Sequence, residues 1–121
     1  MARFRLARRA EADISQILAT SAKNWGIGAR RRYAGLLTRA IRHVAAGPEG
    51  RVTRERTDLA PGLRSFHVRY VRQDDRKAGV RRPVHVLYYR VTWPGLVEIV
   101  RVLHEQMEPS RHLGTATEDE E

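Results

Sequence analysis

The spacing of apolar residues changes abruptly in the middle of this 121-residue chain. Between Ala7 and Gly47, apolar residues recur every three or four positions, which places them along one side of an α-helix. Beyond Pro48 they tend to alternate with polar residues, as in a β-strand with one buried face. Helices in the first half and strands in the second predict an α+β fold. At this length, we expect one domain with a single modest core.

Two helices are predicted in the first half. The first covers about residues 8 to 25 and ends at Gly26, a residue type that commonly terminates helices. The second covers about residues 28 to 46 and ends at the turn sequence GPEGR. Because the break between them is so short, the helices are expected to form an antiparallel hairpin. Their apolar faces consist of Ile14, Ile17, Leu18, Ser21 and Trp25 in the first helix, and of Ala29, Tyr33, Leu36, Leu37, Ala40, Ile41 and Val44 in the second.

Four segments are predicted as strands because they alternate in polarity or are rich in β-branched and aromatic residues. They cover residues 3–6, 63–71, 83–91 and 95–104, with a tight hairpin turn at the WPG sequence of residues 93–95. The expected order is β-α-α-β-β-β, an antiparallel sheet covered on one face by the helical hairpin. The shared core should contain Ile14, Ile17, Leu18, Leu36, Leu37, Ile41, Phe66 and Val68.

Two polar segments are expected to lie outside this core. Residues 72–83 are predicted to form a long charged loop, and residues 114–121 a disordered acidic tail. The folded domain is therefore expected to cover residues 1–113.

The chain is strongly basic, with a formal net charge of +9; the last four residues are acidic, and the chain before them carries +13. Such a charge attracts polyanions or acidic proteins through its summed field. The alternative is that the arginines only solvate helix faces, as charge runs usually do. The basic balance therefore indicates a class of partner, not a function.

Composition also excludes several classes of protein. The absence of cysteine excludes disulfides and thiolate metal sites, and agrees with a cytoplasmic protein. No apolar run approaches the roughly 20 residues needed to cross a bilayer, and no secretory signal is expected at the N-terminus. No glycine-rich phosphate loop, nucleophile elbow or pair of carboxylates at catalytic spacing is present.

The histidines do not form a recognisable metal motif. His104 and His112 have no third ligand at a helical or hairpin spacing, so no metal is expected. His104, at the end of a strand, should bond to backbone or to a nearby carboxylate. His43 and His67 lie in arginine-rich stretches and are interpreted as surface residues.

Four arginines lie within or beside predicted strands: Arg64, Arg69, Arg90 and Arg101. A charged side chain there must reach solvent, a partner or a ligand. One interpretation is ion pairing inside the fold, with Glu98 or Asp58 as the candidate carboxylates. The other is a basic sheet surface that contacts phosphates or an acidic partner. The residues alone do not choose between them.

The aromatic residues and the end of the chain give further expectations. Trp25 and Tyr33 are interpreted as core residues that close the helical hairpin. Tyr88 and Tyr89 lie on opposite faces of one strand, so one should be buried and the other free. Residues 104–113 should leave the sheet and turn back across it at Pro109. In that segment Met107 and Leu113 are expected to anchor the chain, while Arg101, Arg111 and His112 form an anion-attracting patch.

The sequence EIVRVLHEQMEPSRHL resembles the C-terminal signature of ParE-type toxins in the RelE/ParE toxin superfamily. The matching positions are Arg101, Val102, Leu103 and His104, then Met107 and Glu108, then Arg111 and His112. The stretches RLARRAEADISQILATSAKNWG, GPEGR and LAPGLRSF are similar to the front, the middle turn and the second-strand entry of the same family. The resemblance covers residues 3–113.

This resemblance implies a small bacterial, cytoplasmic toxin of a type II toxin–antitoxin module of the kind that stabilises plasmids. It implies inhibition of DNA gyrase, neutralisation by a ParD-like antitoxin in a hetero-oligomer, no cofactor, no membrane, and only indirect contact with nucleic acid. The candidates for target or anion binding are Arg64, Arg90, Arg101, His104, Arg111 and His112. The candidates for antitoxin binding are Trp25, Arg31, Tyr33 and Arg39.

An enzyme is the alternative, namely an mRNA endoribonuclease like the RelE branch. RNA cleavage needs a proton acceptor, a proton donor and a cation near the phosphate. Arg64, Arg90 and Arg101 could supply charge, and His104 or His112 proton transfer. The C-terminal tyrosine typical of that branch is absent, so no catalytic residue is assigned, although Arg54 and Arg56 keep this alternative open. A degenerate toxin that only forms complexes is a third possibility.

Overall fold

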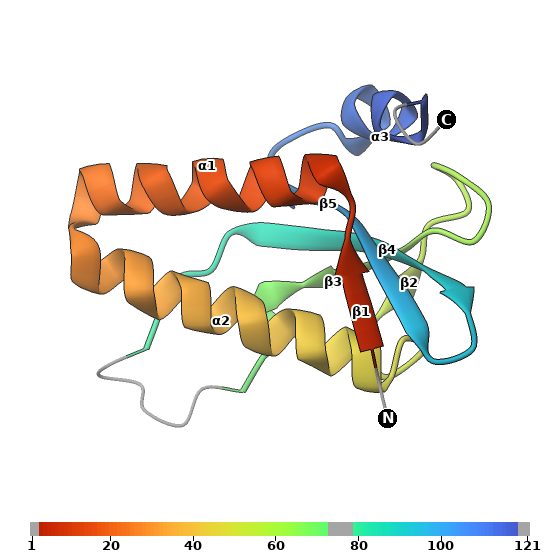
Figure 1. The fold of residues 1–121 in the computed structure, drawn as a ribbon, viewed down its shortest axis with the longest axis horizontal. Coiled ribbons are helices and arrows are strands. Elements are labelled where there is room, and N and C mark those ends of the chain that lie inside the picture. The colour runs from red at the N-terminus through yellow and green to blue at the C-terminus, as the bar shows by residue number, and fades with distance from the viewer. Residues whose placement is uncertain (1–2, 73–78, 119–121) are drawn as a thin grey trace.

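The computed structural model describes residues 3–72 and 79–118, with side chains described as far as Leu113 in the last helix. Figure 1 shows a helical hairpin lying over a twisted sheet, with a short third helix at the other end of the chain. The elements are β1 (Arg3–Leu6), α1 (Arg8–Trp25), α2 (Ile27–Ala46), β2 (Arg54–Glu55), β3 (Arg64–His67), the 3-10 turn η1 (Val68–Tyr70), β4 (His85–Trp93), β5 (Leu96–His104) and α3 (Pro109–Glu118).

The predicted helical hairpin is confirmed, and its second helix begins one residue earlier than expected. Gly26 separates the two helices with φ at 92°, a backbone conformation that side chains disfavour, and its N–H donates to the carbonyl of Ala22. The chain therefore reverses direction at Gly26, and α2 runs antiparallel to α1.

The sheet has five strands in the order β1-β5-β4-β3-β2. Strands β2 to β5 pair antiparallel as expected, but β1 pairs parallel to β5, from Arg3 opposite Leu96 to Leu6 opposite Ile99. The expectation of a wholly antiparallel sheet is therefore wrong at this edge. Parallel neighbours need a long connection, and almost the whole domain lies between β1 and β5.

Two of the predicted strands have different limits. The strand expected at residues 63–71 ends at His67, because Val68 to Tyr70 form the turn η1, although Phe66 and Val68 are both buried as predicted. The strand expected at 83–91 runs from His85 to Trp93 and turns at Gly95, whose φ is 81°. The short strand β2 was not predicted, since two residues carry no pattern. Half of the predicted loop, residues 73–78, lies outside the described residues.

The main core lies between the helical hairpin and one face of the sheet. Leu36, Leu37 and Val44 of α2 are almost fully buried, as are Phe66 and Ile99 of the sheet. Ile14, Ile17 and Leu18 of α1 are partly buried and pack against this cluster. The core residues predicted from spacing therefore meet in one cluster.

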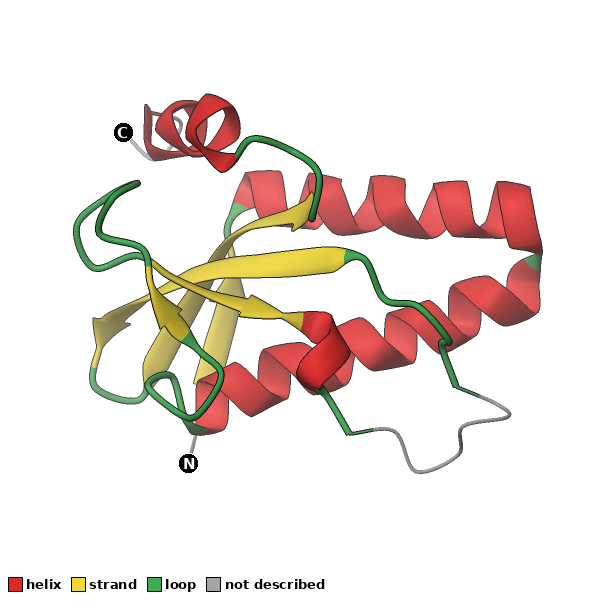
Figure 2. Cartoon of the chain, turned by 180° about the vertical axis from the view of Figure 1, so that it is seen from behind, coloured by secondary structure: helices red, strands yellow, loops and turns green. Residues whose placement is uncertain are grey.

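A second, smaller core covers the opposite face of the sheet. It joins Leu113 of α3 and Leu63 of the loop before β3 to residues of β4 and β5, and consists of Leu63, Tyr88, Val100, Leu103 and Leu113. In the view from behind, α3 lies beyond the end of β5, away from α2 (Figure 2). Because both faces are covered, Tyr88 and Tyr89 are both buried. The expectation that one of them is free is wrong.

The segment after β5 forms a turn and then the helix α3, which was not predicted. Pro109 occupies the first position of this helix, where its missing N–H costs nothing. The helix continues to Glu118, through residues expected to belong to a disordered tail, while residues 119–121 lie outside the described part. Leu113 is buried as predicted, but the prediction that Met107 anchors the chain is wrong, because its side chain is 46% exposed. The N–H of Met107 bonds to the carbonyl of His104, so Met107 lies in the turn after β5.

Candidate functional site

An apolar groove of about 890 Å³ lies between the helical hairpin and the segment that leads into β4. Ile17 and Trp25 of α1 and Tyr33 of α2 line one side, and Val80 and Val84 line the other. Met107 also belongs to the lining. The groove is open to solvent, and its lining is mainly apolar.

The exposed apolar surface continues from the groove to the tip of the hairpin. Trp25 is 78% exposed and Ile27 is 71% exposed. The expectation that Trp25 belongs to the core is wrong, because the last turn of α1 extends beyond the sheet and meets no apolar layer there. Tyr33, by contrast, is buried as expected. Contiguous exposed apolar surface of this kind marks a site of interaction.

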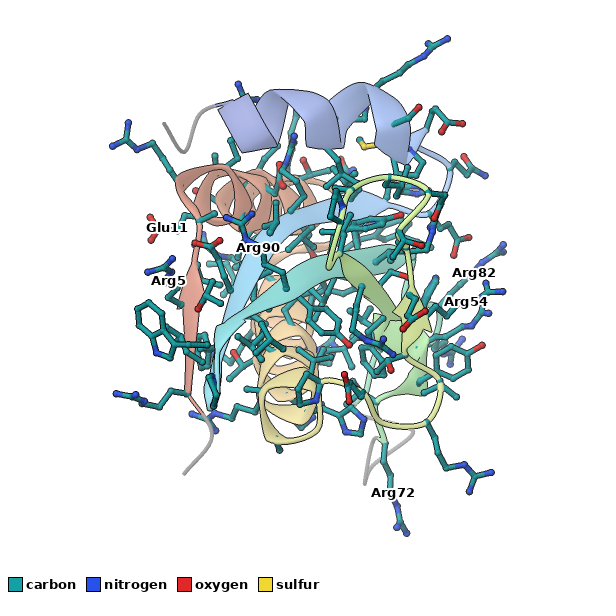
Figure 3. The ribbon with its side chains drawn as sticks, turned by 90° about the vertical axis from the view of Figure 1, so that its right-hand side faces the viewer. Arg5, Glu11, Arg54, Arg72, Arg82 and Arg90 are labelled. Carbon is teal, nitrogen blue, oxygen red and sulfur yellow. The ribbon has the colours of Figure 1, made fainter. Side chains whose placement is uncertain are left out.

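The rim of the groove is basic. The lining includes Arg32 of α2 and Arg81 and Arg82 of the segment before β4, all exposed. Arg82 and Arg54 extend on the side of the molecule away from Arg5 and Glu11 (Figure 3). Arg32 was missed by the sequence analysis. By contrast, the antitoxin candidates Arg31 and Arg39 do not line the groove.

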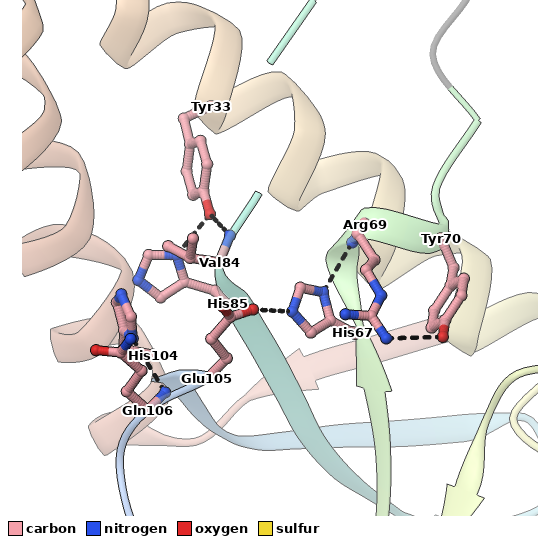
Figure 4. Close-up of polar contacts among 9 residues, drawn as sticks. All are labelled: Tyr33, His67, Arg69, Tyr70, Val84, His85, His104, Glu105 and Gln106. Carbon is pink, nitrogen blue, oxygen red and sulfur yellow. Dashed lines mark hydrogen bonds and ion pairs between the residues drawn. The ribbon is translucent and has the colours of Figure 1, made fainter. Parts of the chain in front are cut away.

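A polar network forms the floor of the groove where α2 meets β4 (Figure 4). The backbone N–H of Val84 donates to the hydroxyl oxygen of Tyr33 at 3.2 Å, and that hydroxyl lies 2.5 Å from Nδ1 of His85. Burial, with repulsion from His104 and His67, lowers the pKa of His85 to about 4. At neutral pH His85 is therefore uncharged, and its Nδ1 can accept the hydrogen bond from Tyr33. Burial raises the pKa of Tyr33.

The remaining histidines of this region are tied to their neighbours. His104 lies opposite His85 across β4 and β5, and its Nδ1 accepts from the N–H of Gln106 at 3.1 Å, as expected for a strand end. His67 was interpreted as a surface residue, but its side chain is only 12% exposed and its Nε2 lies 2.7 Å from a carboxylate oxygen of Glu105. This contact lowers the pKa of Glu105. Over residues 3–72 and 79–118, no group of three or more side chains is placed to hold a metal ion.

Arg5, Arg64 and Arg90 of the sheet bond to other groups within the fold. Arg90 and Arg5 bond the two oxygens of Glu98 from opposite sides, at 3.0 and 2.9 Å. Arg64 donates to the carbonyl of Pro48 and to the hydroxyl of Thr53, and so fixes the turn after α2. For Arg90 and Arg64 the structure therefore provides internal partners, including the Glu98 pair that was one of the two interpretations.

Arg101 joins three parts of the molecule. Its guanidinium donates to both carboxylate oxygens of Asp13, at 2.7 and 2.8 Å, and to the carbonyl of His112 at 3.0 Å. Asp13 also accepts from the N–H of Val102, which lies beyond the last residue that β1 pairs. The acidic side chain thus covers the open edge of β5.

This geometry corrects the expected anion-attracting patch. Arg101 is 8% exposed and its charge is compensated by Asp13, so it does not share an uncompensated charge with Arg111 and His112. Arg111 is exposed at the start of α3 and His112 is partly buried. No local signal could have revealed the ion pair, because 88 positions separate its partners along the chain.

A second hollow, polar and about 860 Å³ in volume, lies on the sheet beside β2 and β3. Arg54, Arg56, His67, Arg69 and Glu105 contribute to its lining. Arg56 is paired with Asp58, and Arg69 donates to the hydroxyl of Tyr70. The hollow therefore brings Arg54 and Arg56, noted in the sequence for their charge, close to a histidine–carboxylate pair.

Comparison with known proteins identifies relatives over nearly the whole chain. Residues 4–109 match the family model described as the ParE toxin of the type II toxin–antitoxin system parDE. A protein named Toxin ParE1 from Mycobacterium tuberculosis is 32% identical over 111 residues, which is 92% of this chain and 97% of that protein. A Toxin ParE1 from Caulobacter vibrioides is 34% identical over 115 residues, with the same coverage.

A solved structure shares the fold. A chain from the chromosomal ParDE toxin–antitoxin system of P. aeruginosa superposes with a TM-score of 0.62 and 16% identity, covering 86% of this chain and 96% of that one. Among the described residues, no helix is long and apolar enough to cross a membrane.

Proposed function

The chain belongs to the ParE family of type II toxin–antitoxin toxins, and on this premise we propose that it inhibits DNA gyrase in the cytoplasm until a ParD-like antitoxin neutralises it. The observation that carries the antitoxin half of this proposal is the apolar groove with its exposed extension at Trp25. The solved chain of the same fold comes from a ParDE toxin–antitoxin system, which supports a protein partner for this fold.

The groove fits an amphipathic segment of the antitoxin. Such a segment would place its apolar side against Ile17, Trp25 and Tyr33, since peptide recognition in grooves relies on apolar anchors at regular spacing. Its acidic side would face Arg32, Arg81 and Arg82 on the rim. Trp25 has the properties of an interface hot spot, because it is large, aromatic and exposed before binding.

The test of the docking site compares two exposed tryptophans. Trp25→Ala should weaken binding of the antitoxin encoded beside the toxin by roughly 30-fold or more, the effect of a residue worth at least 2 kcal/mol. Trp93→Ala is the matched control, because Trp93 is 55% exposed on the turn between β4 and β5, away from the groove. Equal affinities for the two variants would overturn the assignment of the groove.

The basic surface should act mainly on the rate of association. An acidic antitoxin is attracted over long distances by the rim arginines, and by Arg31 and Arg39 on the neighbouring face of α2. We expect the association rate to fall as salt rises, while the dissociation rate changes little. An association rate that ignores salt would contradict an acidic docking segment.

The target half of the proposal concerns the end of the chain. Arg64, Arg90, Arg101 and His104 already have internal partners, so of the proposed target contacts Arg111 and His112 remain for gyrase. Replacing Arg111 and His112 by Ala should weaken toxicity and preserve folding and antitoxin binding. Full toxicity in the folded double variant would show that these residues serve only the C-terminal helix.

A tightly controlled expression experiment tests the target itself. Gyrase inhibition should produce gyrase-dependent DNA cleavage and SOS induction while translation continues. Early loss of translation with cleaved mRNA would instead support a RelE-like endoribonuclease. The observation that favours this second candidate is the polar hollow, where Arg54 and Arg56 lie near the His67–Glu105 pair. Replacing Arg54 and Arg56 by Gln should then abolish mRNA cleavage, whereas it should preserve gyrase inhibition if the first candidate is correct.

A further inference from the structure

Helix α2 carries a concentration of positive charge that the fold does not use. Its twenty residues include five arginines and no acidic residue. Arg31, Arg39 and Arg42 lie on the side that faces away from the buried residues Leu36, Leu37 and Val44, and Arg32 lies at the margin of that side. We call Arg31, Arg39 and Arg42 the outer arginine face. From Arg31 to Arg42 it extends roughly 16 Å along the helix.

The outer arginine face differs from the arginines that form bonds within the fold. Arg5, Arg56, Arg64, Arg90 and Arg101 each bond a carboxylate, a carbonyl or a hydroxyl. Arg31, Arg39 and Arg42 are exposed and have no hydrogen-bond or ion-pair partner in residues 3–72 and 79–118. The fold therefore gives internal partners to Arg5, Arg64, Arg90 and Arg101 of the sheet and leaves the outer arginine face open.

This arrangement does not benefit the helix. Cations in the first turns of a helix oppose its dipole, and the first turn of α2 contains no acidic residue to compensate Arg30 and Arg31. Arg39 and Arg42 are like charges three positions apart, which also disfavours the helix. The charge pattern opposes local stability, so its use has to be sought outside the chain.

The surface between the arginines restricts the partner. Between Arg31 and Arg42 the outer side of α2 presents Gly35 and Thr38 and no large apolar side chain, and the exposed Ile27 lies one turn before Arg31 at the end of this face. A protein interface needs apolar anchors, a membrane-surface helix needs an apolar face, and single strands are bound by stacking on aromatic rings. Arginine is suited to phosphate, because its planar guanidinium can bond two oxygens at once.

We propose that the outer arginine face of α2 binds the phosphate backbone of double-stranded nucleic acid without reading its sequence. The groove lined by Trp25 and Tyr33 is a separate surface, so this activity goes beyond antitoxin docking and does not depend on the identity of the target. It would place the toxin on a duplex by charge alone, with an affinity that depends steeply on salt.

The test measures binding of the full-length chain to a fluorescent mixed-sequence DNA duplex of about 20 base pairs, by anisotropy, between about 50 and 200 mM salt. In the variant, Arg31, Arg39 and Arg42 are all replaced by Gln. The matched control carries Arg3→Gln, Arg8→Gln and Arg51→Gln, which remove the same charge at exposed, scattered positions. Circular dichroism and thermal unfolding check that both variants fold.

Each released counterion contact contributes about 0.9 to the slope of log K against log salt on duplex DNA. The outer-face variant should therefore lower the magnitude of this slope by about 2.7 and weaken binding at least roughly tenfold at low salt. The control should change the slope by less than about 1. The affinity for the antitoxin is measured in parallel. A change in antitoxin affinity without a change in DNA affinity concerns the docking proposal and not the DNA-binding proposal.

Several outcomes overturn the inference. An equal loss of DNA affinity in both triple variants would mean that binding depends on the net charge and not on the outer arginine face. No measurable binding of the parent chain at low salt means that the face has no nucleic-acid ligand. Tighter binding to the single strand than to the duplex contradicts the assignment of the ligand. Loss of antitoxin affinity in the outer-face variant, with DNA binding unchanged, assigns the face to an acidic protein instead.

Discussion

The two faces of the sheet are closed in different ways. The face under the hairpin meets two long helices, and Leu36, Leu37 and Val44 form a continuous apolar stripe along it. The opposite face meets one short helix and a loop, and Leu113 is its only buried contribution from the described side chains of α3. The Arg101–Asp13 ion pair reinforces this second face. We therefore expect the continuous apolar stripe of the hairpin face to contribute most of the free energy of unfolding. The few contacts on the opposite face fix the position of the chain end.

The largest loss of stability is expected from a substitution on the hairpin face. Leu37→Ala removes a side chain that is 2% exposed and leaves a cavity among residues of both helices and the sheet. We expect the free energy of unfolding to fall by about 3 to 4 kcal/mol, measured by urea denaturation. A loss below about 1 kcal/mol would contradict the assignment of this face as the main core.

The next effect is expected at the ion pair that links the two faces. Asp13→Asn keeps an acceptor for the N–H of Val102 but leaves the charge of Arg101 without compensation in a site where both side chains are nearly buried. We expect a loss of about 2 to 4 kcal/mol, because breaking one half of a buried pair is costly. The control is Asp58→Asn, whose pair with Arg56 is exposed. It should unfold like the parent chain, and equal losses would show that the two pairs do not differ.

A smaller effect is expected on the α3 face. Leu113→Ala should cost about 2 kcal/mol, at the low end for a buried leucine, since the second cluster is small. Hydrogen exchange should also accelerate in α3 and remain slow in α2, because the helix would lose its main apolar contact. A loss as large as that of Leu37→Ala would mean that the two faces are equally important.

The last expected effect is a pH dependence on the hairpin side. In the folded protein the pKa of His85 is about 4, below its ordinary value of 6.5, so the unfolded chain binds more protons between these values. Stability should therefore be fully present above pH 6.5 and decrease as the pH falls towards 4. The charged or titratable groups around His85 are His104, His67, Glu105, Asp13 and Tyr33.

The matched variant for this effect is His85→Asn, which keeps an acceptor for the hydroxyl of Tyr33 but does not titrate. The melting temperature of the parent chain should fall more steeply than that of the variant between pH 6.5 and 4.5. Parallel curves would show that His85 does not contribute to the acid sensitivity of the hairpin face.

The elements predicted correctly from the sequence lie mainly on the hairpin face, and those missed lie mainly on the opposite face. The two helices, the hairpin turn at Gly95 and the main core could be predicted, because each depends on spacing within one segment. Helix α3 was missed because, among its described side chains, Leu113 alone is buried against the sheet, too little to produce a periodic pattern. Without α3 the second face is open, which is why one of Tyr88 and Tyr89 was wrongly expected to be free.

The candidate site was predictable only in part. Trp25 and Tyr33 were identified as important, but their positions could not be separated, since both lie at apolar helical spacing. The structure buries Tyr33 against His85 and leaves Trp25 beyond the edge of the sheet. Arg32 was missed because its role depends on the segment before β4, far away in the chain.

By itself, the sequence determined the order of the main elements, the residues of the hairpin core and the membership of the ParE family. These properties are local, or are carried by ordered motifs along the chain. Only the tertiary structure decided which arginines are neutralised: Arg101 meets Asp13 and Arg90 meets Glu98, while Arg31, Arg39 and Arg42 meet no partner in the described residues. The reason is physical, because the cost of a charge depends on the groups that folding brings within a few ångströms, and those groups come from distant segments.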